Sequence, residues 1–272
     1  MAKTILITGA SRGLGRIWAE AFLKEGNKVA ATARNPETLE ELKREYGEAF
    51  LPVQLNVNDR NACFEAVEKV KHEFGTIDVV INNAGSGLFG TIEETTEQEA
   101  RDQFETNVFG LLWVTQAVLP ILREQKSGHI IQVSSLLGVI TFPLLGVYNA
   151  CKFAVEGLGE TLAEEVKDFG IHVTLVEPNG FTTDWGGASA FHTRHMEVYQ
   201  GVRDNFYKDQ ADNSYGDPKA TAAAILKLVD TSNPPLRLFL GKEAFPRTKR
   251  VYADRLKTWE EWSDVANAAH GF

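Results

Sequence analysis

A tyrosine and a lysine four residues apart, Tyr148 and Lys152, occur in the stretch Val-Tyr-Asn-Ala-Cys-Lys that begins at residue 147. On a helix these two side chains share one face. A phenol can donate or accept a proton, and a neighbouring ammonium stabilises its phenolate form. A glycine-rich turn at residues 8–15 is typical of dinucleotide binding. Together these features indicate proton transfer by a phenol beside a bound nicotinamide dinucleotide.

The glycine-rich turn reads Thr-Gly-Ala-Ser-Arg-Gly-Leu-Gly and lies between an apolar segment and an amphipathic one. Gly9 permits a tight turn, Gly13 lets the backbone approach a pyrophosphate, and Gly15 lets a helix pack closely on a sheet. The following helix N-terminus offers free N–H groups to phosphates. The spacing is Gly-x3-Gly-x-Gly rather than Gly-x-Gly-x-x-Gly, and a structural turn without a ligand is the alternative interpretation.

Two arginines indicate which dinucleotide is bound. A cofactor with a free ribose 2′-hydroxyl usually meets an acid about 20 residues after the turn. That place holds Thr-Ala-Arg, ending at Arg34, and contains no acid. Arg34 and Arg12 can instead face a 2′-phosphate, whose geometry suits the guanidinium fork. We therefore predict a preference for NADP over NAD; the alternative is that both arginines are solvated surface residues.

The elements that position these residues alternate along the chain. Short apolar segments predict strands at residues 3–8, 28–33, 50–55, 77–82, 128–134, 171–176 and 236–240. Helical periodicity and capping signals predict helices at residues 14–25, 35–46, 58–74, 96–123, 148–169, 218–229 and 253–269. We expect Pro120 to kink or end its helix. The alternation predicts an α/β fold, a single Rossmann-like domain over residues 1–272 with a doubly wound parallel sheet and helices on both faces.

Over roughly residues 3–184 the chain resembles the short-chain dehydrogenase/reductase family. Four blocks occur in the family's order: the glycine turn, Asn82-Asn-Ala-Gly85, a serine on the fifth strand, and Tyr148-x3-Lys152. The resemblance implies that Tyr148 is the general acid/base. It also implies that Lys152, with the oxidised nicotinamide, lowers the pKa of Tyr148 and that Lys152 binds the nicotinamide ribose.

The resemblance implies further roles. Ser134 and Ser135 could each orient a substrate carbonyl, and the family spacing, thirteen residues before the tyrosine, selects Ser135. Asn107 matches the asparagine that completes the family's catalytic tetrad by holding a helix distortion and a proton-relaying water. Besides the turn glycines and arginines, the implied cofactor-binding residues are Ser11, Leu14, Asn56, Val57, Asn83, Ala84, Gly85, Tyr148, Lys152, Pro178 and Thr183.

Two positions depart from the family pattern. Asn179 stands after Pro178 where the family usually has glycine, so the detail of that turn differs even though Gly180 follows. Asn56 stands where the family often has aspartate near the adenine, and its side-chain oxygen can still accept a hydrogen bond from the adenine amine.

Composition narrows the function classes. The net charge of -9 argues against a nucleic-acid surface. We see no signal peptide and no apolar stretch near the roughly 20 residues of a membrane span, so we expect a soluble, cytoplasmic protein. Cys63 and Cys151 are expected to be buried hydrophobes. His192 and His195 lack evident further ligands, so no metal site is expected.

The predicted function is that of an NADP-dependent oxidoreductase of the carbonyl reductase or alcohol dehydrogenase type, moving hydride between nicotinamide and a small-molecule carbonyl or secondary alcohol. A dinucleotide-binding sensor or scaffold and a sugar-nucleotide epimerase or dehydratase are the alternatives. The resemblance implies that residues 185–216 cover the substrate, and their aromatics either line an apolar pocket or pack: Trp185, Phe191, Tyr199 and Phe206.

Association is expected from the same resemblance. The family usually forms dimers or tetramers through the helices that begin near Asn107 and Tyr148, so a homodimer or homotetramer is predicted. Trp259 and Trp262 lie one helical turn apart near the C-terminus. We expect both to pack against the domain or against a neighbouring subunit.

Overall fold

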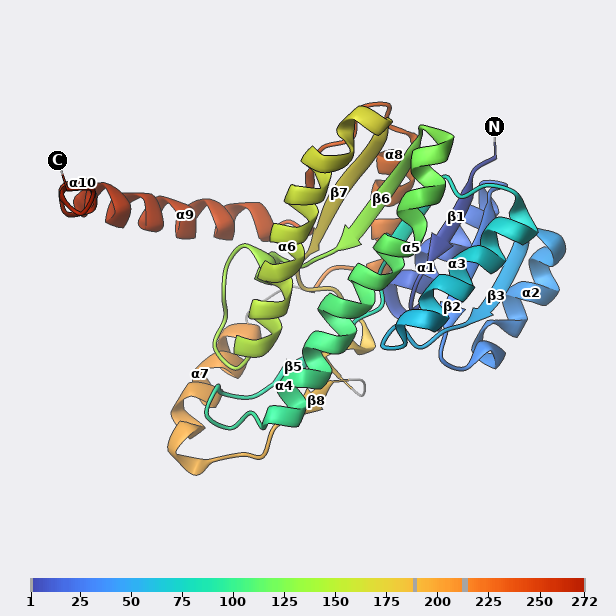
Figure 1. Cartoon of the computed structure of the whole chain (residues 1–272). Coiled ribbons are helices and arrows are strands. Elements are labelled where there is room, and N and C mark those ends of the chain that lie inside the picture. Colours follow the sequence, from blue (N-terminus) through green and yellow to red (C-terminus); the bar gives the residue numbers. More distant parts are fainter. Residues whose placement is uncertain (1, 188–189, 212–214, 272) are drawn as a thin grey trace.

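A parallel seven-stranded sheet forms the centre of the computed structural model, which describes residues 2–187, 190–211 and 215–271 (Figure 1). The strand order is β3-β2-β1-β4-β6-β7-β9. The strands are β1 (Thr4–Ile7), β2 (Lys28–Ala33), β3 (Phe50–Gln54), β4 (Val79–Asn82), β6 (Gly128–Val133), β7 (Ile171–Pro178) and β9 (Arg237–Leu240). All seven predicted strands are therefore confirmed, with ends that shift by at most two residues.

Helices cover both faces of this sheet, as the doubly wound prediction requires. One core surrounds Trp18 and Phe22 and is closed by α1 (Gly13–Lys24), α2 (Glu40–Tyr46) and α8 (Thr221–Asp230). The other surrounds Val67 and Val118 and is closed by α3 (Arg60–Phe74), α5 (Gly110–Gln125) and α6 (Gly146–Val166). Because successive side chains of a strand point to opposite faces, β1 feeds both cores and is buried along its whole length.

The topology places a crevice at the carboxyl ends of β1 and β4. The chain builds β1, β2 and β3 outward in one direction and then returns to place β4 on the other side of β1. Ligands of open α/β sheets bind at such a switch point. The glycine turn after β1 and residues 82–85 after β4 both reach this crevice.

The helix around Pro120 differs in part from the prediction. The helix containing Pro120 does not end there but runs on to Gln125, because Val118, Ile121 and Leu122 around the proline are buried against the sheet. The helical region is irregular upstream of Pro120, where a π-helical turn (Glu105–Phe109) joins α4 (Glu97–Phe104) to α5.

By length and composition the stretch Glu97–Gln125 could cross a membrane, yet 56% of its apolar window is buried inside the protein.

Several elements of the structure were missed by sequence periodicity. A two-stranded sheet of β5 (Leu88–Phe89) and β8 (Phe191–His192) and the helix α7 (Gln200–Ala211) lie in and beside the predicted substrate-covering segment. Residues 188–189 and 212–214 of that segment lie outside the described residues. The last helices are α9 (Ala244–Glu261) and α10 (Ser263–Ala268). The predicted start at 253 is therefore wrong, and Pro246 is accommodated in the first turn of α9, where a missing N–H loses no helical bond.

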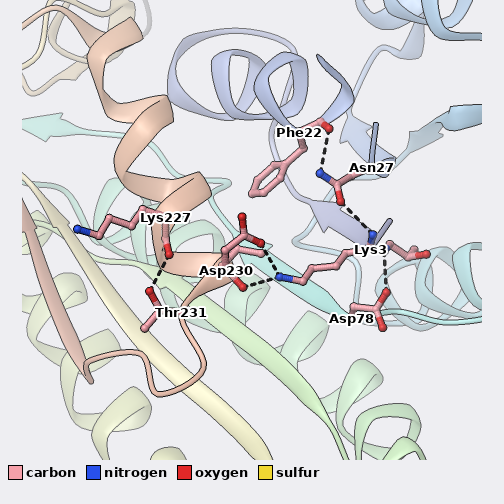
Figure 2. A network of polar contacts seen from close by, with 9 residues as sticks. Lys3, Phe22, Asn27, Asp78, Lys227, Asp230 and Thr231 are labelled. Carbon is pink, nitrogen blue, oxygen red and sulfur yellow. Dashed lines mark hydrogen bonds and ion pairs between the residues drawn. The ribbon is translucent and has the colours of Figure 1, made fainter. Parts of the chain in front are cut away.

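Polar contacts connect the amino-terminal end of β1 to neighbouring elements (Figure 2). Lys3 pairs with Asp230 at 2.8 Å in the last turn of α8, where a cation also meets the negative helix end. Asn27 accepts a hydrogen bond from the Lys3 backbone N–H at 2.9 Å, and Asp78 accepts one from Thr4 at 2.7 Å. These contacts tie β1 to its neighbours and fix where its carboxyl end opens into the crevice.

Candidate active site

The two residues of the Tyr-x3-Lys pattern lie in the first two turns of α6, and both side chains are buried. The Lys152 Nζ donates a hydrogen bond to the Val133 carbonyl oxygen at 2.8 Å. The same nitrogen lies 5.7 Å from the centroid of the Tyr148 ring. The strand β6 therefore fixes the ammonium beside the phenol.

The surroundings of Tyr148 keep its hydroxyl protonated. Burial raises the pKa of Tyr148 above its ordinary value, and a hydrogen bond with Ser135 opposes this rise. Burial also lowers the pKa of Lys152 to about 8, although Cys151 and Glu156 act in the other direction. The protein groups alone thus hold Tyr148 as a proton donor, and a further positive charge beside it is needed to favour phenolate.

The two serines at the end of β6 are placed differently. The Ser135 Oγ accepts a hydrogen bond from the Leu137 backbone at 3.1 Å and shares a side-chain hydrogen bond with Tyr148. The Ser134 Oγ is buried and has no hydrogen-bond partner within the described ranges. This is the placement that the predicted role of Ser135 requires, while the role itself stays a prediction.

Asn107 lies inside the π-helical turn, and both polar atoms of its side-chain amide bind Ser86. Its Oδ1 accepts from the Ser86 N–H at 2.9 Å, and its Nδ2 donates to the Ser86 carbonyl at 2.8 Å. A side chain at Gly85 would come within 3.0 Å of the Asn107 Oδ1. Asn107 thus holds the loop after β4 in place; its predicted part in proton relay remains a prediction.

The glycine turn fits close to the loop after β4. Gly9 has φ +66°, and a Cβ there would lie 2.8 Å from the Ala84 Cα. A Cβ at Gly15 would lie 2.5 Å from the Asn83 Nδ2. The Thr8 Oγ1 accepts hydrogen bonds from the backbone of Asn83 and of Ala84, each at 3.0 Å. These contacts require glycine at both positions and join the two sides of the crevice.

The N-terminus of α1 is open to an anion. Its N-cap, Arg12, is extended and makes no side-chain cap, and the first turn contains no acid. Gly13 has φ +60°, and nothing lies within 4 Å of where its Cβ would be. Free N–H groups and open space at a helix N-terminus suit a phosphate. The turn therefore fits the pyrophosphate of a dinucleotide, with Ser11 exposed and Leu14 half-buried beside it.

The predicted phosphate-recognition arginines lie at the same end of the sheet. Arg12 and Arg34 are both exposed, and the Arg34 carbonyl is held by Gln54 at 3.3 Å. Arg16, by contrast, pairs with Glu41 at 2.9 Å on the outside of α1. Both arginines are thus exposed next to the carboxyl ends of β1 and β2, and their part in binding a 2′-phosphate stays a prediction.

The remaining predicted cofactor residues follow β3 and β7. Asn56 is exposed and accepts a hydrogen bond from the Asn58 N–H at 3.3 Å, while Val57 is buried under Gly110, where an added Cβ would lie 2.7 Å from it. Pro178 ends β7, and the Thr183 Oγ1 accepts from the Trp185 N–H at 3.4 Å. All therefore lie at carboxyl ends of strands, as the switch-point geometry requires.

An apolar wall faces Tyr148. The Trp185 ring lies 4.8 Å from the Tyr148 ring, and Phe89 lies 5.6 Å from Trp185 and 6.5 Å from Phe206. Of the four predicted aromatics, Trp185 and Phe206 therefore join this wall. Phe191 is exposed instead, and Tyr199 bonds to Glu93 at the surface.

For the part of the chain that it describes, the structure supports neither a metal site at His192 nor a reactive cysteine. His192 stacks on Phe89, and within the described ranges no cluster of three His, Cys, Asp or Glu side chains could hold a metal ion. Cys63 and Cys151 are buried, as predicted, and burial raises the pKa of each thiol to about 12. Neither thiol is therefore a ready nucleophile.

Sequence reasoning missed Glu94, which holds the segment that is predicted to cover the substrate. Glu94 accepts hydrogen bonds from the backbone of Thr91 at 2.8 Å and of Met196 at 2.7 Å, and it pairs with Arg203 on α7. Burial opposes ionisation, yet these bonds lower the pKa of Glu94 to about 2. No spacing signal marks Glu94, because two of its three partners, Met196 and Arg203, lie about a hundred residues away in the sequence.

Comparisons with known proteins agree with this arrangement. Residues 3–191 match the profile of the family described as short chain dehydrogenase. Oxidoreductase BOA17 of Botryotinia fuckeliana is 41% identical over 99% of this chain and 100% of that protein. A short-chain dehydrogenase from Streptomyces avermitilis has a crystal structure with a TM-score of 0.93 and 38% identity, covering 98% of each chain.

Two further solved structures contain cofactors. An alcohol dehydrogenase from Thermococcus sibiricus is complexed with 5-hydroxy-NADP and has a TM-score of 0.73 at 29% identity, covering 88% of this chain and 96% of that one. A 3-ketoacyl-(acyl-carrier-protein) reductase from Brucella melitensis is complexed with NADH and has a TM-score of 0.75 at 27% identity, with the same coverage.

Proposed function

The chain belongs to the short-chain dehydrogenase family of oxidoreductases, and from that premise we propose that it interconverts a carbonyl compound and a secondary alcohol with NADP(H). The observation that carries the proposal is the convergence of Ser135, Tyr148 and Lys152 at the carboxyl end of β6. A hydroxyl, a phenol and an ammonium at one point suit proton transfer to a carbonyl oxygen.

Each residue has one task in the proposed reduction. Ser135 holds the substrate oxygen, and Tyr148 donates a proton to it. Lys152, fixed by Val133, keeps a positive charge beside the phenol as that proton leaves. When bound, the nicotinamide supplies the hydride that attacks the carbonyl carbon. Asn107 maintains the loop at Ser86 and thereby the crevice wall.

The pKa of Tyr148 decides which direction of the proposed reaction the protein groups favour. Burial favours the neutral phenol, which is the form that donates in the direction of reduction. Oxidation of an alcohol needs the phenolate instead. Lowering the phenol pKa by about 3 units from its ordinary value near 10 requires ~4 kcal/mol of preferential stabilisation, and burial adds to this requirement. In this proposal Lys152 and the cationic ring of the oxidised cofactor supply it together.

NADP is the proposed cofactor because two positively charged arginines can bind its 2′-phosphate. Arg12 and Arg34 are exposed at the carboxyl ends of β1 and β2, and no acid takes the place that a free ribose hydroxyl would favour. Solved structures similar to this chain contain 5-hydroxy-NADP in one case and NADH in another, so the arginines decide the proposal rather than the likeness.

The site also suggests the kind of substrate and the setting. Trp185 and the wall of Phe89 and Phe206 favour a carbonyl compound with an apolar group. We propose that residues 185–216 cover this substrate and belong to one domain with the rest of the chain. We also propose a cytoplasmic homodimer or homotetramer.

The test is oxidation of NADPH over a panel of ketones and aldehydes, comparing the wild type with Tyr148→Phe. The wild type should consume NADPH with at least one substrate. The variant should lose turnover yet bind NADPH with unchanged affinity, measured by fluorescence titration. NADPH binding without any turnover would instead favour a sensor, and turnover retained by Tyr148→Phe would overturn the mechanism.

A further inference from the structure

The C-terminal helix α9 projects from the body of the protein (Figure 1). It is held at two points: Ala244 at its start is fully buried, and further along the Arg255 Nη1 donates to the Val139 carbonyl at 2.9 Å. From Leu256 to Gly271 every described residue is exposed. Isolated helices of this length are marginal in water, so the projecting part needs a partner to be stable.

An apolar stripe runs along the uncovered side of α9. It consists of Phe245, Tyr252, Leu256 and Trp259, whose spacing of seven, four and three residues puts them on one face. Trp259 and Trp262 are each 62% exposed. Of the two packing modes expected for these tryptophans, packing against their own domain is therefore not what the structure shows.

Apart from the N-cap Glu243, the charges at the two ends of α9 oppose the dipole of an isolated helix. The N-terminal half carries Arg247, Lys249 and Arg250, whereas Glu260 and Glu261 end the helix, with Lys257 at 3.9 Å from Glu261. Acids stabilise a helix at its N-terminus and bases at its C-terminus, yet the first turn of α9 has no acid and its last turn no base. An antiparallel second copy would place each acidic end beside a basic half.

We propose that α9 is a dimer contact in which two copies of this chain pair their α9 stripes antiparallel about a two-fold axis near Leu256. Such a contact is self-complementary, as a two-fold interface must be. Centred there, Tyr252 of one copy meets the partner's Trp259. The proposal does not depend on the catalytic function.

A specific ion pair follows from this register. Lys249 and Glu260 flank the stripe on the same side of α9. They are about 16 Å apart along the helix axis at 1.5 Å per residue, too far to pair within one chain. In the antiparallel dimer Lys249 of one copy faces Glu260 of the second copy, and the reverse pair forms as well. The dimer therefore contains two such ion pairs.

A second copy fits better than a lipid surface. Helices that lie on membranes carry lysine and arginine along the polar face and gain from anionic lipids. Here Glu260, Glu261 and Asp264 surround Trp262, so the end richest in tryptophan is also the most acidic part of the helix. An anionic membrane would repel that end.

The first test uses cross-linking of the full chain. Leu256→Cys places a thiol next to its own copy across the axis, whereas Arg250→Cys places one on the far side of α9. The native cysteines are buried and do not compete. A short bis-maleimide should link Leu256→Cys into covalent dimers and leave Arg250→Cys without a cross-link. Equal yields from the two variants would overturn the proposal.

The second test reverses the flanking charges in the Leu256→Cys background, so that any other interface between copies leaves the readout unchanged. Lys249→Glu and Glu260→Lys should each slow cross-linking about tenfold, because two attractive pairs become repulsive. The double variant should restore the wild-type rate. Failure of that rescue, or sedimentation of a monomeric wild type with phosphatidylserine vesicles, would exclude the α9 pair.

Discussion

The Lys152 Nζ and the Val133 carbonyl oxygen are joined by a hydrogen bond of 2.8 Å that ties α6 to the carboxyl end of β6. The bond directs a cation into a buried site next to the Tyr148 ring. Burial lowers the pKa of Lys152 to about 8, so the charge that the proposed reaction uses costs folding free energy at neutral pH.

Lys152→Met should therefore raise stability while it slows turnover. A lysine whose folded pKa is lowered contributes its full stability only above its ordinary pKa of 10.5, and this stability is lost as the pH falls through about 8. At pH 7 we expect the variant to gain ~1–2 kcal/mol in urea unfolding, with the gain absent near pH 10.5. Lys69→Met, at an exposed position on α3, should show neither effect. A variant that is both destabilised at pH 7 and fully active would contradict this account.

Arg34→Asp should change the cofactor preference. The acid repels a 2′-phosphate and can accept a hydrogen bond from a free ribose hydroxyl. We expect the KM for NADPH to rise about 10- to 100-fold, equivalent to ~1.4–2.7 kcal/mol, while that for NADH stays or falls. The control is Arg44→Asp, which makes the same charge change on the exposed face of α2. Equal shifts for NADPH in the two variants would show that net charge, not the site, is responsible.

The central sheet was predictable because its strands are buried on both faces and therefore appear as short apolar runs, as in residues 4–7. The helix α7 was not, since its sequence is polar and, although Phe206 is buried, Val202 and Tyr207 are exposed. The start of α9 was missed too, because its exposed apolar residues do not pack on the body.

The candidate site divides in the same way. Gly9, Gly15 and the Tyr-x3-Lys pair carry local spacing signals, and the structure brings them to one crevice. The groups that hold these residues in place carry no such signal in the sequence. Lys152 uses a backbone carbonyl, and Asn107 uses the backbone of Ser86. Every residue has such backbone groups, so no residue type in the sequence marks which one is used.

Glu94→Gln should loosen the substrate-covering segment. The ionised Glu94 is buried and pairs with Arg203, so its loss leaves a nearly buried guanidinium without a counter-charge. We expect a loss of ~3 kcal/mol of stability at pH 7 and a higher KM for the carbonyl substrate. Because its pKa is lowered to about 2, the stability from Glu94 is present above its ordinary pKa of 4.5 and lost as the pH falls toward 2. Glu93→Gln next to it should change neither quantity by as much; the same KM in both variants would argue against this anchor.

Glu177→Gln should remove a loss of folding stability that grows as the pH rises and the buried Glu177 ionises. Glu177 is fully buried on β7, its oxygens lack hydrogen-bond partners within the described ranges, and Arg237 is 3.6 Å away but closer to Glu156, at 3.0 Å. Burial, reinforced by Glu156, raises the pKa of Glu177 to about 8. The stability of this protonated acid is complete below its ordinary pKa of 4.5 and is lost as the pH rises through 8. The variant cannot ionise, so in urea unfolding its stability relative to the wild type should increase from pH 5 to pH 9 by ~2 kcal/mol. Glu160→Gln, which removes an exposed partner of Arg237, should show no such trend. A flat difference for Glu177→Gln across this range would mean that Arg237 keeps both buried carboxylates ionised.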